Sequence, residues 1–366
     1  MKKMKKKMMI IACCLLLAGM AFVGIGILSG GTLNFYYALG SKVITDSQLQ
    51  YEMQTEKVES FDSIDVKLDG FGDCQLELIE GDGYSVTYPK ENKYVTGGYK
   101  IENGVLKLET KKKRRLVFFQ MDFLDHKSEK QIMQITVPKG TKLSSLKVDS
   151  EVGDVINALN ADEVVLDLEY GDVEIAGCEF QSMQITNESG EVSISELACD
   201  NCSCQVSFGK VTITDSSIGK LTVENESGNV KIEKTDLADG DFTLSFGKLN
   251  MEDSNVQTAK FNLESGDAGF DNVILGQAEI KMSFGSLKAE GLTVETLTGD
   301  LESGNASLFL TGKKEDYSMR LMVEAGDIKV GKEKVTGGSY QYDAQNTASK
   351  IELENEFGDI RVEFEK

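Results

Sequence analysis

Glycines that recur at a fixed interval constrain this chain more than any other feature of its sequence. Their residue numbers rise by equal steps from Gly171 to Gly304, which gives a repeat of about 19 residues. The series consists of Gly171, Gly190, Gly209, Gly228, Gly247, Gly266, Gly285 and Gly304. Gly153 precedes it by a slightly shorter step, and Gly326 and Gly358 follow at looser intervals. Seven equal steps do not arise by chance, so the chain is built from structural repeats.

Apolar residues occupy fixed positions on both sides of each glycine. The fifth position before the glycine holds Leu166, Ile185, Cys204, Val223, Phe242, Phe261 and Ile280, and polar residues separate this position from the next apolar one. Such period-two alternation is typical of β-strands with one buried face. We therefore predict an all-β fold, a β-solenoid whose coils of about 19 residues bury their apolar faces against one another. A sandwich or barrel is the alternative, but neither requires so strict a register.

The position just before each glycine alternates between an aromatic residue and serine. It holds Tyr170, Ser189, Phe208, Ser227, Phe246, Ser265, Phe284 and Ser303. Counting in steps of two from the apolar positions predicts that these side chains point inward. With about 19 residues per coil, each aromatic lies between two serines and fills a corner of the core. A coil of twice that length would instead stack phenylalanine on phenylalanine, and we favour the shorter coil.

The recurring Glu-Ser-Gly motif first suggests chemistry. The period-two alternation predicts that its glutamates point outward, and serine replaces them in alternate coils. These glutamates are Glu188, Glu226, Glu264 and Glu302. Because neighbouring strands lie about 4.8 Å apart, this replacement separates like charges. We interpret the glutamates as a surface ladder rather than as a cation-binding stripe or a glycosidase carboxylate pair. No catalytic, cofactor-binding or metal-binding residue is predicted, and the glycines are predicted as structural turns.

Five cysteines follow the N-terminal segment, an odd number that cannot pair completely within one chain. Three of them form the string CDNCSC and resemble a metal knuckle. Cys199, Cys202 and Cys204, however, fall at positions that are apolar in other coils, which favours small buried thiols. The same alternation predicts that the side chains of Asn187 and Asn225 point inward. We therefore predict that they form a buried ladder of side-chain hydrogen bonds with Ser189 and Ser227.

The N-terminus carries five lysines among its first seven residues, followed by an apolar stretch from Met8 to Leu28. About 21 residues at roughly 1.5 Å per residue match the hydrocarbon thickness of a bilayer. We predict a cytoplasmic tip (residues 1–7), one transmembrane helix (8–28) and an extracytoplasmic remainder. A cleaved signal peptide is the alternative. Met20 stands where a lipoprotein would need cysteine.

Composition excludes several function classes. The net charge of −21 argues against a nucleic-acid partner. One histidine, His126, and no tryptophan leave little conventional catalytic equipment. A basic run of Lys111, Lys112, Lys113, Arg114 and Arg115 interrupts the acidic pattern, either as solvated charges on a hairpin or as a patch that touches the membrane surface or an anionic wall polymer.

Several segments together resemble a known family. They are FDSIDVKLDGFGDCQLELIEGDGYSVTYP, IENGVLKLET, QITVPKGTKLSSLKVDSEVGDV and SKIELENEFGDIRVEF, with the Ser-Gly repeats between them. The chain is similar over residues 56–366 to the bacterial putative-adhesin family of β-strand repeat proteins, largely of unknown function. The resemblance implies an exported, surface-facing β-solenoid with adhesion or envelope-stress roles, and it supplies no catalytic residues.

These observations predict an order of segments along the chain. After the helix come a linker (29–55), a membrane-proximal β cap (56–140), the regular solenoid (141–312) and C-terminal coils with a cap (313–366). The predicted protein is non-enzymatic and lies at the cell surface, with adhesin-like binding or sensing of a cell-wall polymer or another envelope protein, and with no small-molecule substrate. A modulator of an envelope-stress signalling system is the alternative, and a polysaccharide-active β-helix enzyme is a weaker one.

Overall fold

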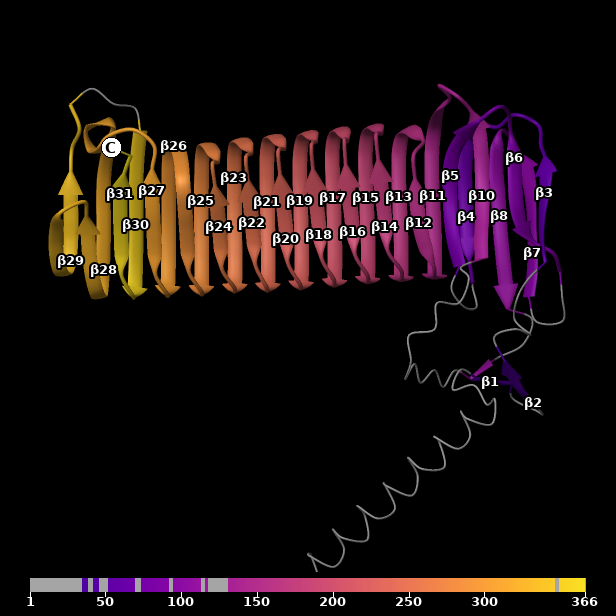
Figure 1. The fold of residues 1–366 in the computed structure, drawn as a ribbon, viewed down its shortest axis with the longest axis horizontal. Helices are drawn as coiled ribbons and strands as arrows, with labels where there is room; N and C mark the ends of the chain where they lie inside the picture. Colours follow the sequence, from indigo (N-terminus) through magenta and orange to yellow (C-terminus); the bar gives the residue numbers. More distant parts are fainter. Residues whose placement is uncertain are drawn as a thin grey trace, which may run out of the picture.

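The computed structural model describes residues 35–38, 42–45, 52–69, 74–91, 95–112, 116–117, 131–345 and 349–365. Its principal feature is a row of coils stacked side by side, with their strands perpendicular to the long axis (Figure 1). The predicted cytoplasmic tip and transmembrane segment (residues 1–28) lie outside the described residues. Within the described ranges, no helix is long and apolar enough to cross a membrane.

Each regular coil consists of a long strand, a corner at glycine, a short strand and a second corner. The long strands are β11 (Lys142–Val152), β13 (Asn160–Tyr170), β15 (Glu179–Ser189), β17 (Ala198–Phe208), β19 (Ser217–Ser227), β21 (Asp236–Phe246), β23 (Asn255–Ser265) and β25 (Ile274–Phe284). The short strands are β12 (Asp154–Asn157), β14 (Val173–Ala176), β16 (Val192–Ser195), β18 (Val211–Thr214), β20 (Val230–Glu233), β22 (Leu249–Glu252) and β24 (Ala268–Asp271). In the next coil, one strand, β26 (Leu287–Ser303), spans both positions, and β27 (Ala306–Leu310) follows it.

The pairing register confirms the shorter of the two coil lengths considered. Long strands pair in parallel with long strands, so that Ile185 lies beside Cys204 and Phe208 beside Ser227. Short strands pair with short strands at the same offset, as Ile194 does with Ile213. Each coil therefore covers the apolar face of the next, and the all-β repeat architecture predicted from the periodicity is confirmed.

The interior is a continuous apolar core along the stack. The positions five before each glycine are almost completely buried, from Leu166 to Ile280. Phe242 and Phe261, in adjacent coils, stack with their ring centroids 5.2 Å apart. This contact shows that side chains at equivalent positions of neighbouring coils pack directly on each other, as a parallel in-register stack requires.

The two corners of the coil differ in backbone conformation. At the first corner stand the repeating glycines, most with φ between +132° and +157°. The second corner uses a left-handed residue once per coil, and most of these residues are not glycine: Glu196, Asp215, Lys234, Asp253 and Asn272 have φ between 48° and 54°. The sequence does not reveal this second corner, because no single residue type marks it.

At the N-terminal end of the stack, the order in space differs from the order in sequence. β4 (Ser63–Leu68) lies between β8 (Val105–Lys112) and β11, and β5 (Cys74–Gly81) lies between β10 (Gln131–Pro138) and β12. Antiparallel partners complete this end: β3 (Met53–Lys57) pairs with β6 (Ser85–Pro89), and β7 (Val95–Glu102) pairs with β8. A separate small sheet contains β1 (Phe35–Ala38), β2 (Lys42–Thr45) and β9 (Leu116–Val117).

The C-terminal end is also built out of sequence order. After the short 3₁₀ helix η1 (Lys314–Asp316), β28 (Tyr317–Val330) and β29 (Glu333–Tyr342) form an antiparallel hairpin. The final strands, β30 (Ser349–Phe357) and β31 (Ile360–Phe364), then insert between this hairpin and the coil of β26 and β27. Figure 1 shows these strands side by side at the yellow end of the stack.

Candidate functional site

Five exposed aromatic side chains form the most unusual surface feature of the described residues. We call this set the aromatic row: Tyr170, Phe208, Phe246, Phe284 and Phe357. Each is between 55% and 61% exposed. The prediction that the position before each glycine points inward is therefore wrong for every aromatic in the series, and the intervening serines are only half-buried.

The error has a local cause at the glycine corner. In each long strand the ladder pairing is interrupted one residue before this position, as at Glu188 between Asn187 and Ser189. Counting in steps of two holds only along a straight strand. The backbone already turns toward the corner here, so the residue before glycine leaves the interior.

Buried asparagines stabilise this corner. The side-chain amides of Asn187 and Asn225 donate to the glycine carbonyl of the preceding coil, with Nδ2–O distances of 2.9 Å to Gly171 and 3.0 Å to Gly209. Both asparagines are buried, as their parity predicts. The predicted side-chain ladder with the serines is wrong, because the amide nitrogens bond to backbone and the side chain of Ser189 is not in the core.

The glycines below the row are required by close backbone contact. A Cβ atom built on Gly209 or Gly228 would lie 1.8 Å from the carbonyl oxygen of the glycine in the preceding coil. Gly358 meets Gly304 in the same way, and Gly326 meets Gly358. The glycine column therefore follows the spatial order of the coils and includes the two glycines that stand outside the sequence period.

The aromatic row follows the same spatial order. Ser303 pairs with both Phe284 and Phe357, so the coil of Phe357 comes two coils after that of Phe284, although the two residues are far apart in sequence. Aromatic and small residues alternate without a break through this inserted coil. Adjacent strands are about 4.8 Å apart, so the aromatics recur about every 9.6 Å over roughly 38 Å.

Charged residues flank the row on both sides. On one side, the glutamates two positions before glycine are exposed, as predicted; they are Glu188, Glu226, Glu264 and Glu302. No hydrogen bond or ion pair to another described residue involves their carboxylates. On the other side, Lys210 Nζ lies 3.2 Å from Glu191 Oε1, and Lys248 Nζ lies 3.3 Å from Asp267 Oδ2. The unpaired carboxylates leave hydrogen-bond acceptors free beside the aromatics.

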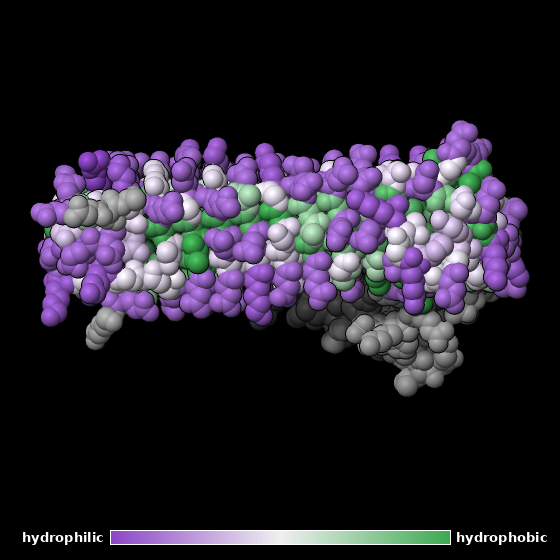
Figure 2. Space-filling model, turned by 90° about the horizontal axis from the view of Figure 1, so that it is seen from above, coloured by the Kyte–Doolittle hydropathy of each residue, from purple (hydrophilic) through white to green (hydrophobic). Residues whose placement is uncertain are grey.

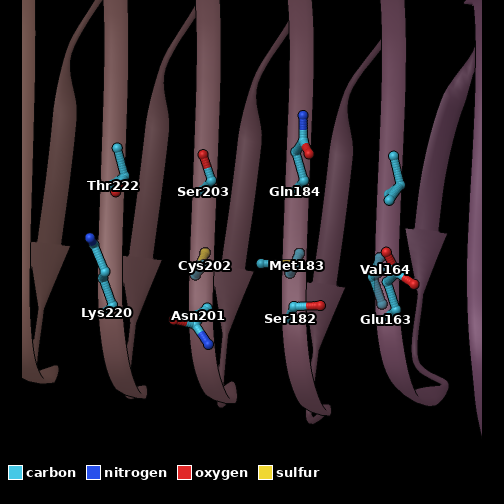
Figure 3. Close-up of a pocket in the computed structure, with 11 residues that line it drawn as sticks. Glu163, Val164, Ser182, Met183, Gln184, Asn201, Cys202, Ser203, Lys220 and Thr222 are labelled. Carbon is cyan, nitrogen blue, oxygen red and sulfur yellow. The ribbon is translucent and has the colours of Figure 1, made fainter.

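A second candidate is a hollow of about 240 Å³ on the face formed by the long strands (Figure 3). Side chains from four adjacent coils line it, with Glu163 and Lys220 at its charged edges and Met183 and Cys202 at its base. Its volume is below the range of roughly 300–1,000 Å³ that is usual for small-molecule sites. Its charged side chains, Glu163 and Lys220, come from the first and the last of these four coils.

The CDNCSC cysteines lie in the core, as the repeat alignment predicts. Cys199, Cys202 and Cys204 are each at most 5% exposed, and the Cys202 and Cys204 sulfur atoms are 4.0 Å apart. Burial raises the pKa of Cys199 to about 11. No group of three His, Cys, Asp or Glu side chains in the described ranges could hold a metal ion.

The basic run is only partly within the described residues. Lys111 is exposed at the end of β8, and its Nζ lies 2.7 Å from Glu109 Oε2. The hydrogen bond to Glu109 raises the pKa of Lys111. Lys112 belongs to the same strand, whereas Lys113, Arg114, Arg115 and His126 lie outside the described residues. The predicted basic patch therefore stays a prediction.

Comparison with known proteins gives one family match. The model of the family described as Toastrack DUF4097 matches residues 62–246 and 220–363, which together cover most of the chain. No curated protein matches the sequence.

Three solved structures illustrate the structural similarity. A putative adhesin from Bacteroides fragilis is 16% identical over 68% of this chain and 97% of its own, with a TM-score of 0.32. A putative cell adhesion protein from Clostridium sporogenes is 10% identical over 86% of this chain and 100% of its own, with a TM-score of 0.20. A putative lipid binding protein from Parabacteroides distasonis is 15% identical over 71% of this chain and 92% of its own, with a TM-score of 0.32.

Proposed function

Because this chain belongs to the Toastrack DUF4097 family, we propose that it is a non-enzymatic, adhesin-like binding protein of the cell envelope. In this proposal residues 8–28 anchor the chain in the cell membrane as a single span, and the stacked coils lie outside the cytoplasm. The segment that supports this placement is the lysine-rich tip followed by the apolar stretch from Met8 to Leu28.

The observation that carries the binding function is the aromatic row. Aromatic side chains usually bury about 150–250 Å² each, so five that are more than half exposed present on the order of 500 Å² of apolar surface. Because these rings lie in one line along the stack rather than being scattered singly over the surface, they favour an interaction site.

The regularity of the coils favours binding over catalysis. An active site needs several different groups converging on one point. Here the exposed aromatics and the glutamates beside them are repeated at two-coil spacing along the stack, and the hollow near Glu163 offers no such convergence. Figure 2 shows the upper side of the rod in Figure 1, which is the side of the second corner and not that of the aromatic row; hydrophilic residues dominate it, with a lengthwise band of apolar residues between them.

The test uses the full chain expressed in a bacterial host. Protease added to intact cells should cut the coils away from the membrane fraction, and purified chain should co-sediment with isolated cell envelopes without releasing soluble sugar from them. Protection of the coils from external protease would contradict the proposed location. Recovery of one envelope protein as the ligand, with no binding to envelope polymer, would replace adhesion with the signalling-modulator alternative.

A further inference from the structure

We infer that the aromatic row and the glutamates beside it bind one extended, β-1,4-linked polysaccharide chain without anionic groups, laid along the stack. This inference rests on the proposed function and names the chemical class of its partner. The site comprises Phe208, Phe246 and Phe284 at its centre, with Glu226 and Glu264 in the coils between them.

The spacing of the row selects the ligand class. Aromatics recur about every 9.6 Å, two strand spacings. In an extended β-1,4-linked glycan each sugar is turned over relative to its predecessor, so the same face recurs at every second sugar, a repeat close to this distance. An extended peptide repeats every two residues at about 6.8 Å and would lose register with the row after one step.

A polyproline II peptide is the nearest competitor. Its turn of three residues advances about 9.3 Å, which also approaches the spacing of the row. Such peptides are recognised in grooves lined by several aromatic side chains. The row instead offers single rings separated by Ser227 and Ser265, which are too small to form groove walls. Single exposed rings at regular spacing suit the flat, C–H-rich face of a sugar.

The flanking groups match the polar edge of a sugar. Each two-coil unit contains one aromatic ring and, in the coil between, one exposed carboxylate such as Glu226 or Glu264. A carboxylate only accepts hydrogen bonds, and sugar hydroxyl, acetamido or amino groups can donate them. The same carboxylates, on a chain of net charge −21, repel polymers that carry phosphate or uronate.

The inserted C-terminal coil gives independent support. Phe357 belongs to a segment that lies outside the strict sequence period. It nevertheless lies beside Ser303, in the coil where the alternation of aromatic residues and serines calls for an aromatic. Duplication of a two-coil sequence unit would explain the series from Tyr170 to Phe284, but it would not explain Phe357, which lies outside the sequence period. A need for an exposed aromatic in every second coil would explain the series and Phe357 alike.

The test is co-sedimentation of the purified full-length chain with insoluble polysaccharides of defined linkage. Microcrystalline cellulose and chitin are the β-1,4-linked probes, and amylose, which is α-1,4-linked and coils, is the matched control. We expect binding to at least one β-1,4-linked probe and none to amylose. Equal binding to amylose, or binding to neither β-1,4-linked probe, would overturn the inference.

Variants locate the site. Phe208→Ser, Phe246→Ser and Phe284→Ser, combined, place in each coil the residue that its neighbours already carry, and should weaken binding by roughly tenfold or more. Ile274→Asn removes a comparably exposed apolar side chain at the other corner, where Asn255 stands in the adjacent coil, and should leave binding unchanged. Unchanged thermal unfolding of the triple variant shows that it is folded.

The outcomes separate this inference from the proposed function. Envelope binding that survives in the triple variant, or that a basic proline-rich peptide abolishes, would overturn the glycan site and leave adhesin-like binding intact. Absence of binding to whole envelopes by the unaltered chain would contradict both.

Discussion

At the scale of single residues, the glycine column sets how closely the coils approach. A Cβ atom on a glycine of the column would lie against the carbonyl oxygen of the glycine in the preceding coil, and most of these glycines have a φ that other residues rarely adopt. The close backbone contact and the unusual φ are both needed for the corner that turns the aromatic side chains outward.

Replacement of Gly228 by alanine should therefore destabilise the protein severely. The new Cβ would lie 1.8 Å from the Gly209 carbonyl oxygen, at a backbone φ of +150°. We expect a loss of more than about 3 kcal/mol, measured as a lower midpoint in urea unfolding. Gly98→Ala is the matched control, because a Cβ at Gly98 meets nothing within 4 Å. Equal midpoints for the two variants would refute the close-contact account.

The core thiols should be chemically inert in the native protein. Burial raises the pKa of Cys178 to about 12 and that of Cys199 to about 11. The reactive thiolate is therefore scarce in both at pH 9, where an ordinary cysteine is substantially ionised. Mass spectrometry after iodoacetamide treatment should show neither residue alkylated in the native chain and both alkylated in urea. Rapid native alkylation of either would contradict its burial.

At the residue scale the sequence predicts the interior well and the corner badly. Cys202 and Asn225 can be placed inside because apolar residues fill their positions in other coils. The sequence wrongly places Phe208 inside, because the alternation of inward and outward side chains does not continue through a turn. Its hydrophobicity does not reveal the error, since an exposed and a buried phenylalanine cannot be distinguished in a sequence.

At the scale of elements, a cluster of one carboxylate and two phenols ties three strands together at the N-terminal end. Glu56 on β3 accepts hydrogen bonds from Tyr88 on β6 at 2.6 Å and from Tyr99 on β7 at 2.9 Å. These bonds lower the pKa of Glu56. Burial first, and then the bond to Glu56, raise the pKa of Tyr88 to about 12.

This cluster predicts a dependence of stability on pH at both extremes. The raised pKa of Tyr88 favours the protonated phenol in the folded state, so its contribution is complete below pH 10 and is lost as the pH rises through about 12. The lowered pKa of Glu56 gives a contribution that is present above its ordinary value of 4.5 and is lost as the pH falls.

Titration of tyrosine by NMR measures the effect directly. Tyr88 should titrate near pH 12 in the unaltered chain. In Glu56→Gln its pKa should fall but stay above 10, because burial is the larger cause. A normal titration of Tyr88 near pH 10 in the unaltered chain would show that the cluster does not form.

The inserted C-terminal coil makes a second element-scale prediction. A chain that ends at Gln345 lacks β30 and β31, so that β27 loses its partner β31 and β28 loses both β30 and β31. Because stacked repeats are stabilised chiefly by adjacent repeats, we expect amide exchange to accelerate in β27 and β28 but not in β13 to β17. A peptide of residues 349–365, added in trans, should restore protection. Unchanged protection in β27 and β28 would contradict the insertion.

This insertion is beyond prediction from the sequence. The strict period ends at Gly304, and the partners of β30 are β26, in the preceding coil, and β28, in the terminal hairpin. The glycine and the alternation of apolar and polar residues indicate that residues 349–364 form strands. They do not indicate which coil these strands pair with. Pairing that skips a coil is decided by which apolar face remains uncovered.

At the scale of the whole molecule, the structure is a straight support for a repeated surface. Successive coils are held in register by backbone pairing, so the aromatic row is preorganised and need not be ordered on binding. The exposed ion pairs along the rod contribute little individually to stability. The surface chemistry is therefore free to serve recognition, while the apolar interior and the glycine corners maintain the fold.

Hydroxyl-radical footprinting of the full chain, with and without isolated cell envelopes, tests the central claim that the aromatic row is the exposed binding surface. In the free chain, Phe208, Phe246 and Phe284 should be oxidised readily, and the core residues Phe242 and Phe261 should not. Envelopes should protect the three row residues and leave Ile274 unchanged. Slow oxidation of the row in the free chain, or row residues that stay fully reactive in the bound chain, would contradict the account.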